Sequence, residues 1–198
     1  MKIVLASGSA SRLSILRNAG VEPFVDPPNV DEQSIITSLN DAEPADVLTS
    51  LAVAKAAAIA GKHPDDVIIA ADSMLLLDGE LQGKPHTVEA TIERWKNQRG
   101  KTAHLMTGHC IISPGGRAVY EHVASTTVTF GIPSDYDIER YAASGEPLPC
   151  AGAFTLEALG GWFIDRIDGD PSNVIGLSLP VVRAALYNFG LHVSQFWK

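Results

Sequence analysis

The sequence predicts one α/β domain over residues 1–198, a mixed twisted β-sheet flanked by helices. Three observations lead to this fold class. Short apolar runs typical of strands alternate along the chain with stretches whose apolar residues recur at helical spacing. Several helical stretches begin near Ser or Pro and end before Gly, as capped helices do. Some strands lead into a helix and others into a tight turn, so both parallel and antiparallel pairs are expected.

The first half of the chain opens with a strand, a small polar turn and a helix. Residues 3–6 form a short apolar run, and the helical pattern that follows stops at Gly20. Asp78-Gly79 is a hairpin-type turn after a long apolar segment. The expected elements are strands over residues 3–6, 21–25 and 67–71, the last continued by 74–77, and helices over 11–19 and 44–61.

The second half predicts two long strands that are joined by Pro114-Gly115-Gly116. Ser134 and Asp137 have the spacing of a capping box, which marks the start of a helix. The expected elements are helices over residues 87–99, 134–144 and 180–189, and strands over 104–113, 118–130 and 162–167.

The composition and charge of the chain argue against several classes of function. The chain has 23 acidic and 15 basic residues and a net charge of −8, which argues against a nucleic-acid polymer as partner. No apolar run approaches the roughly 18 to 20 residues that span a bilayer, so no membrane partner is expected. Cys110 and Cys150 cannot form a disulfide framework, and the apolar run at the N-terminus is too short for a signal peptide. A cytoplasmic protein is therefore expected.

The segment from Leu5 to Arg12 is the most informative. Small residues at the end of a strand, here Ser7, Gly8 and Ser9, let backbone N–H groups point at one spot before a helix begins. Arg12 in the first turn can then bind phosphate oxygens. The alternative is an ordinary Ser-rich helix cap with a surface arginine.

Four other sites are candidates for chemistry, and the first three have an ordinary structural alternative. Asp72 follows a buried run and needs a partner or a metal, or else caps a turn at the end of the strand. Asp31-Glu32 could hold carboxylates over a cleft, although a solvated pair fits the pattern better. Lys55, in an Ala-rich helix, has the pattern of a surface lysine whose stem lies along the helix. Lys84, before Pro85, would be a fixed point charge for phosphate.

Several familiar sites are absent from the sequence. There is no Walker A loop, no dinucleotide glycine fingerprint and no Gly-x-Ser-x-Gly elbow, which argues against a dehydrogenase or serine hydrolase. His104, His109 and Cys110 lack zinc-ligand spacing, so core or surface roles are expected for them. A phosphate cradle, a few cations and two separated carboxylates remain. These are the parts of a hydrolase that uses a divalent metal to cleave phosphoryl or nucleotidyl groups.

Taken together, these segments resemble the Maf family of nucleoside triphosphate pyrophosphatases over essentially the whole chain. Nine short stretches occur in the family's order. They are Leu5-Ala6-Ser7-x-Ser9-x-x-Arg12, Asp31-Glu32, Leu51-Ala52-x-x-Lys55-Ala56, Ile69-x-Ala71-Asp72, Gly83-Lys84-Pro85, Thr107-Gly108, Tyr141-x-x-x-Gly145-Glu146-Pro147, Ala151-Gly152-Ala153-Phe154 and Asn173-x-x-Gly176-Leu177.

The resemblance implies an elongated, two-lobed, ITPase-like architecture with a central nucleotide cleft, often as a homodimer. It implies metal-dependent hydrolysis of a nucleoside triphosphate to the monophosphate and pyrophosphate, with Mg²⁺, Mn²⁺ or Co²⁺. Asp72 matches the proton acceptor, and Glu32 and Asp72 match the metal ligands. The substrate-binding positions are Ser7, Ser9, Arg12, Lys55 and Lys84.

Two branches of the family differ in substrate. The stretch from Cys150 to Glu157 is similar to the branch that hydrolyses 7-methyl-GTP, and the Glu157 carboxylate could accept hydrogen bonds from a guanine edge. Ser11 and Ser73 are further specificity positions, and they depart from this branch, which has Trp and Gln there. The alternatives are a dTTP and UTP pyrophosphatase, or a nucleotide-binding regulator of cell division with weak catalysis.

Overall fold

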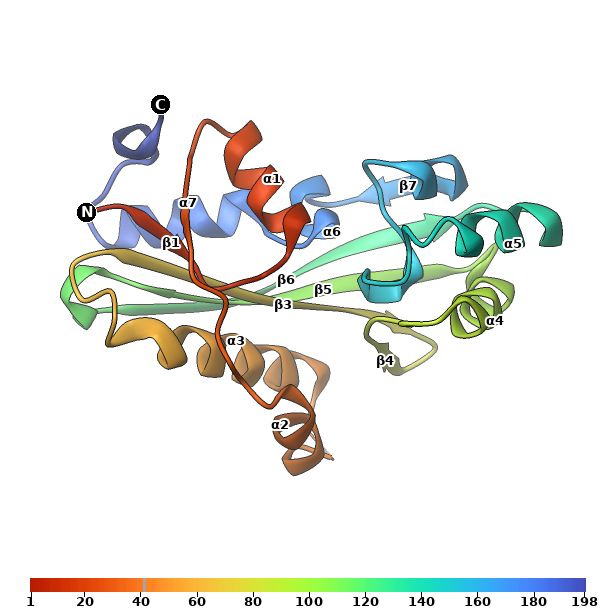
Figure 1. Cartoon of the computed structure of the whole chain (residues 1–198), viewed down its shortest axis with the longest axis horizontal. Coiled ribbons are helices and arrows are strands. Elements are labelled where there is room, and N and C mark those ends of the chain that lie inside the picture. Colours follow the sequence, from red (N-terminus) through yellow and green to blue (C-terminus); the bar gives the residue numbers. More distant parts are fainter. Residues whose placement is uncertain (41) are drawn as a thin grey trace. The chain divides into compact units, whose positions relative to one another are not determined.

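The computed structural model describes residues 1–40 and 42–198, and it forms a seven-stranded mixed sheet with helices around it (Figure 1). The strand order is β2-β1-β3-β5-β6-β7, with β4 paired to β3. β1 runs parallel to β2 and β3, whereas β4 is antiparallel to β3 and β7 is antiparallel to β6. The predicted fold class, a mixed sheet flanked by helices, is confirmed.

The predicted helices and strands occur in the expected order, and β4, α2 and α6 are additional elements. The strands are β1 (Ile3–Leu5), β2 (Phe24–Val25), β3 (Val67–Leu77), β4 (Glu80–Gln82), β5 (Thr102–Ile112), β6 (Val119–Phe130) and β7 (Ile164–Asp168). The α-helices are α1 (Ala10–Asn18), α2 (Glu32–Ser38), α3 (Pro44–Ala60), α4 (Val88–Gln98), α5 (Asp135–Ala143), α6 (Pro171–Ile175) and α7 (Leu179–Asn188).

The chain divides into two compact units, and β3, β5 and β6 contribute residues to both. The first unit holds Met1–Asp72, Thr107–Ala124 and Gly176–Lys198. The second holds Ser73–Met106 and Ser125–Ile175. The prediction of one domain with two lobes around one cleft stays a prediction.

Small residues let α3 lie directly on the sheet in the first unit. Ala52 and Ala56 of α3 are buried against Val4, Ile68 and other core residues. A Cβ at Gly108 of β5 would lie 2.4 Å from the Leu48 carbonyl oxygen of α3, so only glycine fits this contact. Figure 1 shows α3 on one face of the sheet and α1 and α7 on the other.

The second unit is built on aromatic packing around Trp95 of α4. Its ring meets those of Phe130, Tyr141 and Phe163 edge to face, at centroid distances of 5.5–5.8 Å. The buried indole Nε1 donates to the Ala153 carbonyl at 2.7 Å, which satisfies its only polar group. This packing ties α4 and α5 to the loop that follows Cys150.

The structure corrects several predicted elements. Neither α2 nor α6 was predicted; α2 contains no buried residue, so it has no apolar face that a periodic pattern could reveal. The strand expected over 21–25 is reduced to β2, and Val21 instead forms an isolated bridge with Trp197. The strand expected over 162–167 begins at Ile164, because residues 159–163 form a 3-10 turn.

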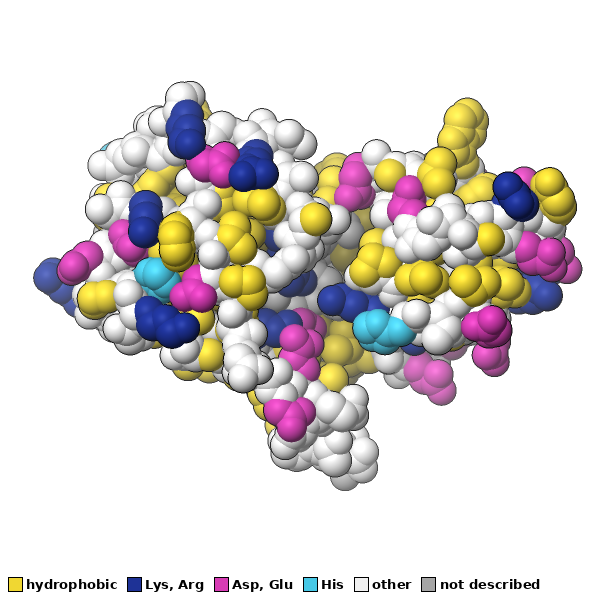
Figure 2. Space-filling view, viewed as in Figure 1, with side chains coloured by type: hydrophobic (Ala, Val, Ile, Leu, Met, Phe, Trp, Pro, Cys, Tyr) yellow, Lys and Arg dark blue, Asp and Glu magenta, His cyan; other side chains and the backbone are white. Residues whose placement is uncertain are grey.

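The surface carries mixed charge. On the face drawn in Figure 2, acidic and basic side chains are interspersed. The most exposed large hydrophobic side chains are in the second unit, where Trp162 is 86%, Ile132 81% and Tyr136 70% exposed. Across residues 1–40 and 42–198, every helix is too short or too polar to cross a membrane.

Candidate active site

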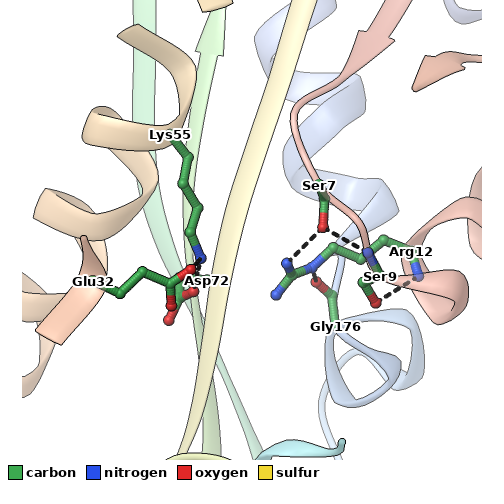
Figure 3. Close-up of polar contacts among 7 residues, drawn as sticks. All are labelled: Ser7, Ser9, Arg12, Glu32, Lys55, Asp72 and Gly176. Carbon is green, nitrogen blue, oxygen red and sulfur yellow. Dashed lines mark hydrogen bonds and ion pairs between the residues drawn. The ribbon is translucent and has the colours of Figure 1, made fainter. Parts of the chain in front are cut away.

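Ser7, Ser9 and Arg12 form a hydrogen-bonded cradle between β1 and α1 in the first unit (Figure 3). Ser9 is the N-cap of α1, and its hydroxyl accepts the Arg12 backbone N–H at 3.4 Å. The Ser7 hydroxyl accepts the Ser9 N–H at 3.2 Å and Arg12 Nη1 at 3.1 Å. Arg12 Nε donates to the Gly176 carbonyl at 2.7 Å. The guanidinium therefore folds back over the turn that precedes the helix, where it contacts Ser7 and Gly176.

The Arg12 guanidinium is under opposing electrostatic influences. Burial lowers its pKa, whereas the nearby carboxylates of Asp72 and Glu32 raise it, and the net shift is downward. Arg12 thus lies close enough to both carboxylates to interact with them electrostatically. The surface-arginine alternative for this position is wrong, because the side chain is only partly exposed.

Glu32, Lys55 and Asp72 form a second cluster on α2, α3 and β3 (Figure 3). The Lys55 ammonium donates to Asp72 Oδ1, and it lies 2.9 Å from Glu32 Oε1. Lys55 and Asp72 are each 7% exposed, whereas the Glu32 side chain is half exposed. A buried pair of opposite charges surrounded by apolar strand residues needs this mutual compensation.

Two interpretations from the residue pattern are corrected here. Lys55 is not a surface lysine, because the α3 face that carries it packs against the sheet, where Asp72 compensates its charge. Asp31 and Glu32 are not simply a solvated pair. Asp31 caps α2 by accepting the Ser34 N–H at 3.0 Å, and this places Glu32 next to Lys55.

Lys84 lies in the second unit, exposed on a loop whose backbone is held in place. The Gly83 carbonyl accepts the Arg94 guanidinium and the Gly152 N–H, the latter at 3.3 Å. Pro85 is buried beside it. The backbone next to Lys84 is therefore held in place, and a fixed position for its ammonium stays a prediction.

Glu157 and Lys84 both lie near Cys150 in the second unit. The pKa of the Cys150 thiol is raised to about 11, mainly by burial and further by Glu157 and Glu146, while Lys84 lowers it. The Glu157 carboxylate accepts the Leu156 N–H at 3.1 Å and is exposed. Lys84 and Glu157 therefore lie around one patch of this unit.

The remaining specificity positions occupy ordinary places in the chain. Ser11 is partly exposed in the first turn of α1, one residue before Arg12. Ser73 follows Asp72 in β3, so the alternation of a strand turns their side chains to opposite faces. Ser73 is the first residue of the second unit.

Sequence reasoning assigned no role to Glu146, although it organises the loop that carries Glu157. Its carboxylate accepts the Thr155 hydroxyl at 2.5 Å and the backbone N–H groups of Leu159 and Gly160 at 3.2 Å. These hydrogen bonds outweigh burial and keep the pKa of Glu146 below its ordinary value. The stretch Gly145-Glu146-Pro147 was the only available signal.

The fold and these clusters define an α/β protein with a compact group of charged side chains in its first unit. A serine and arginine cradle lies beside two carboxylates that share one ammonium group. The chain matches the Maf-like protein family over residues 2–189, and it belongs to that family.

Relatives of high identity carry one enzyme name. The chain is 68% identical to the nucleoside triphosphate pyrophosphatase of Corynebacterium diphtheriae over 197 residues, which cover all of this chain and 98% of that protein. It is 50% identical to the enzyme of the same name from Nocardia farcinica over 204 residues, 99% of this chain and 96% of the relative. Among solved structures, the Ham1 protein of Staphylococcus aureus is 18% identical, with a TM-score of 0.44 over 66% of this chain and 72% of that one.

Proposed function

We propose that this chain hydrolyses a modified nucleoside triphosphate, 7-methyl-GTP above others, to the monophosphate and pyrophosphate with a divalent metal. The observation that carries the proposal is the convergence of Glu32 and Asp72 on the Lys55 ammonium, next to Arg12. This set combines groups that bind phosphate with carboxylates that can accept a proton or hold a cation.

The enzyme class predicted from the sequence is confirmed. The chain belongs to the Maf family, and two relatives that are 68% identical over 98% and 99% of their length are named nucleoside triphosphate pyrophosphatases. A nucleoside triphosphate is the substrate class that this name requires. The base, the metal and the residue roles are the proposed part.

In the proposed reaction, Arg12 and the Ser7–Ser9 turn hold phosphate oxygens, and Lys55 orients the Asp72 carboxylate. A water oxygen bonds to the α-phosphorus while the bond from that phosphorus to the bridging oxygen breaks. Pyrophosphate leaves, and Asp72 accepts the proton of the water. Lys84, in the second unit, is a further phosphate-binding position that the family resemblance implies.

The carboxylates fit a divalent metal of the Mg²⁺ type. The formal charges of Arg12, Lys55, Glu32 and Asp72 cancel, so a triphosphate bound there needs further positive charge. Mg²⁺ is commonly held by one or two carboxylates and substrate phosphates. Among the described residues there is no cluster of three or more His, Cys, Asp or Glu that could hold a metal ion. When bound, such an ion supplies charge stabilisation for the transferred phosphoryl group.

Glu157 supports the choice of base. Its exposed carboxylate can accept hydrogen bonds from the N–H groups of a guanine edge, and its negative charge favours a cationic methylated ring. Ser11 and Ser73 are the two other positions that the family resemblance implies for specificity. A pyrimidine triphosphate lacks this pair of neighbouring donors, which is the reason that we place dTTP and UTP second.

A nucleotide panel tests the proposal. The wild-type chain is given 7-methyl-GTP, GTP, UTP, dTTP, CTP and 5-methyl-UTP with Mg²⁺, Mn²⁺ or Co²⁺, and pyrophosphate and phosphate are measured separately. Pyrophosphate release that is fastest from 7-methyl-GTP and lost with EDTA supports it. Preference for pyrimidines overturns the choice of base alone. Tight nucleotide binding with no pyrophosphate release from any nucleotide overturns the reaction and favours the regulator.

Assembly and location are further parts of the proposal. A homodimer would cover exposed apolar side chains such as Trp162 and Ile132 of the second unit. Light scattering of the purified chain measures the mass of the assembly, and a monomer at assay concentration contradicts the dimer. A cytoplasmic location is the expected one for an enzyme of this substrate class.

A further inference from the structure

His109 is a buried histidine that the proposed reaction does not use. It lies in β5 and is 0% exposed. The preceding residue, Gly108, faces α3, so strand alternation turns the His109 side chain to the opposite face of the sheet, where α7 begins. There its Nε2 accepts the backbone N–H of Ser178 at 2.9 Å.

Ser178 belongs to the short segment that also holds Arg12. Ser178 is the N-cap of α7, and its hydroxyl accepts the Val181 N–H at 3.2 Å. Two residues earlier, the Gly176 carbonyl accepts Arg12 Nε at 2.7 Å, and Gly176 has a φ of 121°. One end of this segment, residues 176–178, is therefore anchored by His109, and the other end receives the Arg12 guanidinium.

This anchor requires a neutral imidazole. A backbone N–H can only donate, so the Nε2 that accepts it must be unprotonated, and the ring proton is on Nδ1. The charged and titratable groups that face the ring are Arg12 of α1 and His122 of β6. Burial lowers the pKa of His109 most, and the charges of Arg12 and His122 lower it further. Backbone groups of His122 and Thr107 act in the opposite direction, but the net shift is downward, so the imidazole is neutral near pH 7.

We propose that His109 is a positioning residue for nucleotide hydrolysis: through Ser178 it fixes the segment whose Gly176 carbonyl orients the Arg12 guanidinium. The inference rests on the proposed function, in which Arg12 binds phosphate oxygens. Loss of the Nε2 acceptor leaves the Ser178 N–H without its partner and allows the segment to move. Arg12 then loses a fixed acceptor for Nε, and phosphate binding weakens.

The direct test is a double-mutant cycle between His109 and Arg12. His109→Met removes the acceptor at similar volume, while His109→Gln keeps a carbonyl oxygen near the position of Nε2. We expect His109→Met to raise the KM for the preferred nucleotide about tenfold with kcat changed less, and His109→Gln to recover most of the loss. In an Arg12→Ala background, His109→Met should change kcat/KM less than twofold, because the guanidinium that His109 positions is already absent.

Two further measurements make the outcomes distinguishable. His104→Gln, an exposed histidine on the same strand, is the matched control and should change kcat/KM less than twofold. The NMR signal of Arg12 Nε–H, assigned with Arg12→Lys, reports the hydrogen bond to Gly176 without any turnover. It should exchange slowly in the wild type and in His109→Gln, and rapidly in His109→Met. If His109→Met does not fold, His109→Asn, which is too short to reach Ser178, replaces it.

Equal losses of kcat/KM in the wild-type and Arg12→Ala backgrounds would overturn the inference, and so would a slowly exchanging Arg12 Nε–H in His109→Met. If the wild type releases no pyrophosphate from any nucleotide, the proposed function fails. The exchange of Arg12 Nε–H then still decides whether His109 positions Arg12.

Discussion

Lys55 and Asp72 form an ion pair in which each residue is 7% exposed, between a helix and the central strand. Glu32 approaches the same ammonium from the solvent side, at 2.9 Å. The buried carboxylate is thus held in a fixed orientation by a cation that is itself buried. This relationship allows a charged group to remain on an otherwise apolar strand.

Removal of the ammonium should destabilise the fold. Lys55→Met leaves the Asp72 carboxylate buried without its partner, which costs about 3–5 kcal/mol in the free energy of unfolding. Urea unfolding measures this loss. Lys62→Met is the control, because Lys62 is exposed and its contact with Asp26 is 3.8 Å long, and it should change stability by under about 1 kcal/mol. Equal stability of the Lys55→Met and Lys62→Met variants would show that Asp72 does not depend on Lys55.

Asp72→Asn should abolish most turnover and leave the nucleotide bound. An amide cannot accept the proton of the attacking water, and loss of a general base typically lowers kcat about 10²- to 10⁴-fold. Single-turnover release of pyrophosphate measures the effect, and Asp65→Asn, on an exposed turn, serves as control. A kcat within threefold of the wild type would remove Asp72 from the proton transfer.

Arg12→Lys should weaken substrate binding more than it slows chemistry. Lysine has one donor centre in place of the fork that contacts Gly176 and Ser7, so it cannot keep both contacts and bind phosphate. We expect KM to rise about tenfold, the cost of about 1.4 kcal/mol of binding. The control is Arg17→Lys on the same helix, where the exposed side chain pairs with Glu22. An unchanged KM in Arg12→Lys would argue against phosphate contact by Arg12.

Protonation of the buried His109 imidazole should lower the free energy of unfolding at acid pH. Burial, with Arg12, lowers its pKa from 6.5 to about 4. The unfolded state therefore binds a proton that the folded state does not, and the stability contribution present above pH 6.5 is lost as pH falls toward 4. The total is about 3 kcal/mol. Urea unfolding of wild type and His109→Gln at pH 7 and pH 4.5 measures it. The loss between these pH values should be smaller in His109→Gln, and an identical loss would contradict the prediction.

Glu157→Gln should reduce the preference for the methylated base. The amide keeps the shape of the side chain but loses the charge that favours a cationic ring. We expect the ratio of kcat/KM for 7-methyl-GTP to that for UTP to fall about tenfold, a difference of about 1.4 kcal/mol. Glu139→Gln, exposed on α5 of the same unit, should leave this ratio unchanged. A ratio unaffected in both variants would place base recognition elsewhere.

Helix caps, turns and buried strands could be predicted from the sequence because they depend on residues that are close together in the chain. Ser9 and Ser134 cap the helices that their spacing predicts, and Asp78-Gly79 makes the turn between β3 and β4. The apolar run from Val67 is typical of a central strand, and it forms the first part of β3. Helix α2 escaped detection because all of its residues are at least partly exposed, and apolar periodicity reports only helices that bury a face.

The sequence by itself determined the fold class, the family, and the list of charged residues that could serve the site, and it left the cradle at Ser7 and Arg12 open against an ordinary helix cap. Only the tertiary structure decided which of these residues meet. Lys55 reaches Asp72 across 17 positions and Arg12 reaches Gly176 across 164, so each contact depends on how helices pack on the sheet rather than on residue spacing. Because of the same packing, Lys55 is buried although its sequence pattern predicts a surface residue. His109 contacts Ser178 for the same reason. The proposed chemistry thus depends on contacts between residues far apart in the sequence, and neither periodicity nor composition predicts such contacts.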